Sequence, residues 1–130
     1  MADVFISYKR DQRNRVKALA DRFLAEGLSV WFDASLEVGR GEGFDAEIER
    51  EVTSAHCVIA CWTPEATRSV YVRAESKKGL ERNLLVPLLL EPCNLPVPFN
   101  AVDFVDFTLW KGEEGFEGWV GLLTFGQTKS

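Results

Sequence analysis

Short apolar runs alternate along the chain with segments in which apolar residues recur every three or four positions. The runs have the length and composition of buried β-strands and occupy residues 3–8, 28–33, 55–62, 84–90 and 102–107. The third run is continuously apolar at residues 57–60, which is typical of a strand covered on both faces. Asp103 and Asp106 in the fifth run indicate an edge strand.

Helical spacing is found between these runs. The apolar residues that show it are Val16, Leu19, Ala20, Phe23 and Leu24, then Phe44, Ile48 and Val52, then Val72, Gly79 and Leu80, and last Phe116, Val120 and Leu123. The first helix is expected to end near Gly27, where a left-handed cap suits glycine. The third is expected over residues 69–80, with Ser69 as its N-cap.

The connecting segments are polar or rich in glycine and proline. Residues 9–13 and 63–68 are expected to be loops, and residues 34–43 form a longer loop with three glycines. Residues 92–98 contain three prolines and are expected to be extended, without a full helix. Pro87 lies inside the fourth strand and cannot donate to a ladder, so a bulge or a position at the end of the sheet is expected there.

Alternation of strands and helices predicts a parallel sheet with helices on both faces. With five strands, we expect a three-layer, flavodoxin-like α/β fold with the strand order 2-1-3-4-5. A length of 130 residues suits one domain. We assign residues 1–126 to that domain and residues 127–130 to a polar tail.

Charge and composition narrow the class of partner. The net charge of −5 argues against a nucleic-acid groove or an anionic membrane surface. The first residues lack the pattern of a signal peptide, and the three cysteines have neither zinc nor CxxC spacing, which favours a reducing, cytoplasmic setting. His56 is the only histidine, so a metal cluster or a histidine-based triad is not expected.

Ligands of such sheets bind beyond the carboxyl ends of the strands, where the winding reverses, here between the first and third strands. Tyr8, Lys9 and Arg10 follow the first strand at this edge, and residues 33–43 follow the second. Tyr71 and Glu75 are one turn apart on the third helix, and we place them on a different face from its apolar residues. The simpler interpretation is a solvated Glu75 that pairs with Lys78.

This sequence lacks the residues that other functions known on this fold require. A phospho-accepting receiver needs an acidic pair after the first strand and an aspartate ending the third, and Lys9, Arg10, Cys61 and Trp62 are found instead. GxxxxGK[ST] and GxSxG do not occur, and the glycines of residues 39–43 lack GxGxxG spacing.

Four motifs in order resemble a Toll/interleukin-1 receptor (TIR) domain over roughly residues 2–125. They are DVFISY at residues 3–8, VWFD at 30–33, LEVG at 36–39 and SxxVxxE at 69–75. The chain resembles bacterial, NAD-cleaving TIR domains more than adaptor types, because Glu75 occupies their catalytic glutamate position. It departs from them in having Tyr71 where many carry tryptophan, and Val38 where proline is usual.

The resemblance implies that Glu75 is catalytic and that Lys9 and Arg10 contact the nucleotide. The full substrate-binding set is expected to be Tyr8, Lys9, Arg10, Asp33, Glu37 and Tyr71. It also implies that residues 34–43 form the BB loop, through which TIR domains associate. The loop residues expected to make these contacts are Ser35, Leu36, Val38, Gly39, Arg40 and Gly41.

A single carboxylate suits the reaction that these relatives catalyse. Nicotinamide leaves NAD+ as a neutral molecule, so no general acid is needed, whereas ordinary glycosidases need two carboxylates. The first hypothesis is therefore an NAD+ glycohydrolase or cyclase acting in immune defence signalling, activated by self-association, with NAD+ as substrate and neither cofactor nor metal. The second is a non-enzymatic module that docks other TIR domains through the BB loop.

Overall fold

The computed structural model describes residues 3–31 and 42–110. Its core is a five-stranded parallel sheet in the order β2-β1-β3-β4-β5, which confirms the predicted topology. The strands are β1 (Val4–Ser7), β2 (Val30–Trp31), β3 (Cys57–Trp62), β4 (Leu85–Leu89) and β5 (Val105–Asp106). The winding reverses between β1 and β3, as expected, and β5 is an edge strand.

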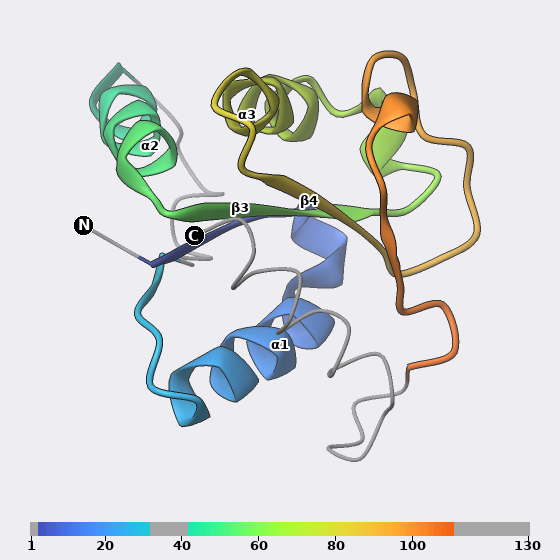
Figure 1. Cartoon of the computed structure of the whole chain (residues 1–130), viewed down its shortest axis with the longest axis horizontal. Helices are drawn as coiled ribbons and strands as arrows, with labels where there is room; N and C mark the ends of the chain where they lie inside the picture. Colours follow the sequence, from blue (N-terminus) through green and yellow to red (C-terminus); the bar gives the residue numbers. More distant parts are fainter. Residues whose placement is uncertain (1–2, 32–41, 111–130) are drawn as a thin grey trace.

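Helices cover both faces of the sheet. Helix α1 (Arg13–Ala25) lies below it in Figure 1, and helices α2 (Glu42–Ser54) and α3 (Val70–Glu81) lie above it. Short 3-10 turns are found at η1 (Arg10–Gln12), η3 (Ala66–Arg68) and η4 (Phe99–Ala101). The molecule is therefore the three-layer α/β structure that the alternation of elements predicts.

Side chains of β1 alternate between the two faces of the sheet and contribute to a separate hydrophobic core on each face. Val4 and Ile6 pack with α1 residues on one face of the sheet. Phe5 packs on the other face with residues of α2, α3 and β3, and its ring stacks on Trp31 with 5.1 Å between ring centroids. Because side chains alternate along a strand, Ser7 belongs to the same face as Phe5, below α2 and α3.

Several predicted boundaries were wrong. Among the described residues, every strand is shorter than its apolar run, because the terminal residues of the runs make connections instead of ladder pairs. Both predicted polar loops, at residues 9–13 and 63–68, contain a 3-10 turn. The predicted last helix, the polar tail and most of the glycine-bearing loop fall outside the described residues.

Pro87 is the middle residue of β4, not at an end of the sheet. Backbone groups of Leu84 and Leu90 face β3, whereas the Leu89 carbonyl accepts from Phe107 on the β5 side. Backbone groups alternate in direction along a strand, and Pro87 is two residues before Leu89, so the nitrogen of Pro87 also faces β5. Pairing with β5 begins only at Leu88, and hence no ladder bond there needs an N–H from Pro87.

The predicted glycine cap of the first helix is confirmed. Gly27 has φ +86°, the Gly27 N–H donates to the Leu24 carbonyl, and the Leu28 N–H donates to the Phe23 carbonyl. These two bonds make a Schellman motif. Leu28 and Phe23 also share a hydrophobic core, so the cap directs the chain from α1 back toward β2.

The start of β1 is tied to β2 by a carboxylate, and this makes stability depend on pH. The backbone N–H of Ser29, then its hydroxyl and nearby His56, hold the pKa of Asp3 below its ordinary value. A lowered folded-state pKa adds stability above the unfolded pKa, and this stability is lost as pH falls through the folded-state pKa.

We expect wild type to unfold at a higher urea concentration than Asp3→Asn near neutral pH. That difference should shrink as pH falls below the ordinary aspartate pKa of 3.8 and through the lower folded-state pKa, and a constant difference would contradict the assignment.

The cysteines are free thiols, and Cys57 and Cys61 are buried. Burial raises the pKa of the Cys61 thiol to about 12, and burial together with Glu91 raises the pKa of the Cys93 thiol.

Because the thiolate is the nucleophile, we expect iodoacetamide to modify the folded chain slowly and only at Cys93. Mass spectrometry of the alkylated peptides measures this, and modification of Cys61 as fast as Cys93 would contradict the burial.

Candidate active site

Helix α3 carries the predicted catalytic glutamate, and its start is fixed as the sequence predicts. The Ser69 hydroxyl accepts from the Val72 N–H at 3.2 Å, an N-cap bond. The two side chains one turn apart differ sharply in exposure: Tyr71 is 43% exposed and Glu75 only 7%. The prediction that Glu75 lies on a different face from the apolar residues of this helix was wrong, because Glu75 is buried together with Val72 and Gly79.

Glu75 is held by the end of β1. The Ser7 hydroxyl donates to Glu75 Oε1 at 2.6 Å in a buried contact between the last residue of β1 and the second turn of α3. Ala60 pairs with Ser7 in register on β3, so two small side chains lie side by side where the carboxylate approaches the sheet. Sequence reasoning missed Ser7, although its alternation with Phe5 pointed to the correct face.

A cavity of about 200 Å³ lies between α2 and α3 beside the carboxylate. Its lining residues are Ile48, Glu49, Val52, Tyr71, Ala74, Glu75 and Lys78. Lys78 Nζ lies 3.6 Å from Glu49 Oε1, which makes an ion pair across the two helices. The simpler interpretation of Glu75 as a solvated side chain is wrong, because Glu75 is buried, and Lys78 forms an ion pair with Glu49.

Other contacts fix α3 against its surroundings. The Arg82 guanidinium donates to the Val52 carbonyl at 3.0 Å and ties the end of α3 to α2. Gly79 lies directly on Val58 of β3, at a distance that leaves no room for a side chain. Glu75 is thus placed by a helix that is capped, bonded to its neighbour and packed closely on the sheet.

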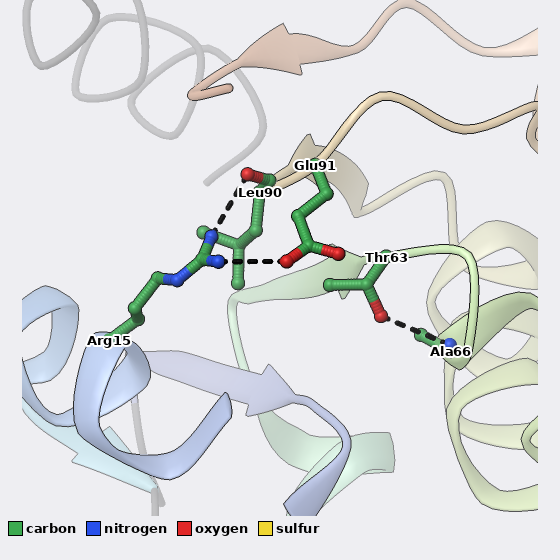
Figure 2. Close-up of polar contacts among 5 residues, drawn as sticks. All are labelled: Arg15, Thr63, Ala66, Leu90 and Glu91. Atoms are coloured by element: carbon green, nitrogen blue, oxygen red, sulfur yellow. Dashed lines mark hydrogen bonds and ion pairs between the residues drawn. The ribbon is translucent and has the colours of Figure 1, made fainter. Parts of the chain in front are cut away.

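The carboxyl edge of the sheet is also built from side-chain contacts (Figure 2). The Arg15 guanidinium, from α1, donates to the Leu90 carbonyl and to Glu91 Oε2, both at 2.9 Å. Thr63, fully buried after β3, accepts from the Ala66 N–H at 3.1 Å and shapes the turn that leads to α3. These bonds hold the segments after β3 and β4 at the edge where a ligand is expected.

The predicted substrate residues are brought together only in part. Tyr71 and Glu75 line one cavity. Tyr8, Lys9 and Arg10 follow directly after Ser7 at the same edge of the sheet, but they are not among the residues that line it. Asp33, Glu37 and the predicted interaction residues Ser35, Leu36, Val38, Gly39, Arg40 and Gly41 lie outside the described residues.

In residues 3–31 and 42–110, no three histidine, cysteine or acidic side chains are grouped as a metal site would need. Within the same ranges, no helix has the length and apolar content to cross a membrane.

Comparisons with known proteins agree with this architecture. The family model of the TIR domain matches residues 4–120. The fold is similar to the TIR domain of the Toll-related receptor TRR-2 from Hydra magnipapillata, with a TM-score of 0.78 and 18% identity over 98% of this chain and 99% of that one. It is also similar to the TIR domains of the activated Roq1 resistosome that directly recognizes the pathogen effector XopQ. There the TM-score is 0.57 and the identity 22%, over 68% of this chain and 57% of that chain. No curated protein matches the chain significantly.

Proposed function

The chain belongs to the TIR domain family, and from that premise we propose that it cleaves NAD+ at the bond between nicotinamide and ribose. The proposed products are nicotinamide and either ADP-ribose or a cyclic form of it. The family includes NAD-cleaving enzymes as well as adaptors. The proposal places this chain with the enzymes, of the kind found among bacterial TIR domains.

The observation that carries the proposal is the buried carboxylate of Glu75 at the edge of a cavity. Carboxylates are seldom buried without a partner or a function, and a buried acid in a concave site is a candidate for chemistry. Glu75 has a hydroxyl donor from Ser7 and an aromatic neighbour in Tyr71. A negative charge fixed in a place of low dielectric can stabilise a positive charge that develops nearby.

The proposed reaction needs a carboxylate to stabilise the ribose but no general acid to protonate the leaving group. The carbon–nitrogen bond breaks with its electron pair going to the pyridinium nitrogen, so nicotinamide leaves neutral and needs no proton. Positive charge develops on the ribose, where Glu75 acts. Water then adds to the ribose carbon and loses a proton to solvent, or a nitrogen of the adenine adds in the cyclic case.

The size of the cavity indicates which part of the substrate it takes. Sites for whole drug-sized ligands measure roughly 300–1,000 Å³, and this cavity measures about 200 Å³. It therefore suits the flat nicotinamide end, beside Tyr71, and not the whole dinucleotide. Lys9 and Arg10, at the same edge of the sheet, are the proposed contacts of the phosphates.

We further propose that self-association controls this activity. TIR domains generally associate with one another, and one of the similar structures is an assembly named a resistosome. A site completed by the BB loop of a neighbouring copy would be active only in an assembly, which suits a defence signal.

The first test is nicotinamide release from NAD+ by the whole chain, free in solution and crowded on beads. Release that rises with crowding supports the proposal, and none in either state opposes it.

An adaptor function is the second candidate, favoured by one observation. Val70 at the start of α3 is 76% exposed and Tyr71 beside it is 43% exposed, so two apolar side chains are accessible to a partner there. Under this alternative, Gly39→Pro in the BB loop abolishes association, and Glu75→Ala has no biological effect. Under the enzyme proposal, Glu75→Ala removes signalling while association persists.

A further inference from the structure

We propose that Ser7 is a positioning residue for Glu75 in NAD+ cleavage, an inference that rests on the function proposed above. Its hydroxyl donates a hydrogen bond to a buried carboxylate, at a donor–acceptor distance of 2.6 Å. This is the short distance expected of a hydroxyl that donates to an ionised acceptor. Ser7 itself is 1% exposed, so water does not compete for the bond.

The position of Ser7 in the sheet fixes the direction from which its hydroxyl donates to Glu75. Ser7 is the last residue of a central strand that pairs with both β2 and β3, so its backbone is fixed by the ladder. Its side chain points to the α2 and α3 face because of the alternation along β1. A donor on such a rigid strand fixes the rotamer of Glu75 more narrowly than a donor on a loop would.

The neighbouring residues indicate that the position is kept open for the carboxylate. Ala60 pairs beside Ser7, whereas the surrounding positions on this face hold the large side chains of Phe5 and Trp62. A side chain of the size of Phe5 or Trp62 at position 7 would occupy the space that Glu75 enters. Ser7 combines a small volume with a hydroxyl donor, which alanine lacks.

Positioning and simple structural support make different kinetic predictions. If Ser7 orients Glu75 for the transition state, Ser7→Ala lowers kcat and leaves KM nearly unchanged, because the hydroxyl does not touch the substrate. Loss of a hydrogen bond to a charged group corresponds to a fall in kcat of roughly tenfold to a hundredfold. Ser7→Thr retains the hydroxyl and is expected to recover most of this loss.

The chain offers a matched control one residue beyond Glu75. Ser76 is fully buried on the same helix, and within the described residues its hydroxyl has no hydrogen-bond partner. Ser76→Ala removes the same atom from the same layer, and we expect it to leave kcat unchanged.

The experiment measures kcat and KM for nicotinamide release by the whole chain crowded on beads, with unfolding midpoints recorded for each variant. A kcat defect in Ser7→Ala, absent in Ser76→Ala and recovered in Ser7→Thr, supports the positioning role. Equal kcat in wild type and Ser7→Ala, or a Ser7→Thr variant as slow as Ser7→Ala, overturns it. Wild type without activity instead overturns the proposed function itself.

Discussion

Replacing Glu75 by glutamine is expected to lower nicotinamide release from NAD+ by at least roughly a hundredfold, the loss typical of removing a fixed electrostatic group. Glutamine keeps the size of the side chain, and its amide oxygen can still accept from the Ser7 hydroxyl. The fold should therefore persist while the negative charge is lost. Initial rates of nicotinamide release at equal crowding measure the effect.

Glu81 is the matched control for this substitution. It is an exposed glutamate at the end of the same helix and is not among the residues that line the cavity. Glu81→Gln changes the net charge by the same amount and is expected to leave the rate unchanged. If Glu75→Gln retains the wild-type rate, or if Glu81→Gln loses as much activity, the assignment of the carboxylate is wrong.

Gly79→Ala is expected to be the substitution that most destabilises α3. A Cβ atom at this position would lie 2.8 Å from Val58 Cβ, and neither atom can rotate away. Overpacking of a core costs about 1–3 kcal/mol, against a gain in helix propensity of about 1 kcal/mol. Because the clash joins two fixed atoms, we expect a net loss of about 1–2 kcal/mol in the free energy of unfolding.

Urea unfolding followed by circular dichroism measures this loss, and a double-mutant cycle locates its origin. Val58→Ala removes the two methyl groups at 3.1 Å from the new side chain but keeps the Cβ atom at 2.8 Å, so it relieves part of the clash. The double variant should then lose less stability than the sum of the single variants. A Gly79→Ala protein as stable as wild type would show that α3 does not pack this closely on β3.

The sequence predicted the layers of this fold well, because its signals are local. Continuous apolar runs mark parallel strands, and Gly27 and Ser69 mark the helix ends that the structure confirms. Pro87 was correctly placed inside the fourth strand, but the way in which the sheet accommodates it was not predicted, because that depends on where β5 begins, which no local pattern contains.

The candidate site was predicted less completely, for a related reason. Glu75 was singled out by its spacing from Tyr71 and by resemblance, but its buried hydrogen bond is to Ser7, 68 residues away in the chain. The pairing of Lys78 with Glu49 instead of Glu75 likewise depends on how α2 meets α3. Contacts between distant segments are what a single sequence does not reveal.

The measurement closest to the central claim is product analysis of NAD+ incubated with wild type and Glu75→Gln at the same density on beads. For wild type we expect nicotinamide to appear in equal amount to ADP-ribose and its cyclic form together, and for the variant almost none. Unchanged NAD+ with both proteins, or equal nicotinamide from both, would contradict the claim that Glu75 makes this chain an enzyme.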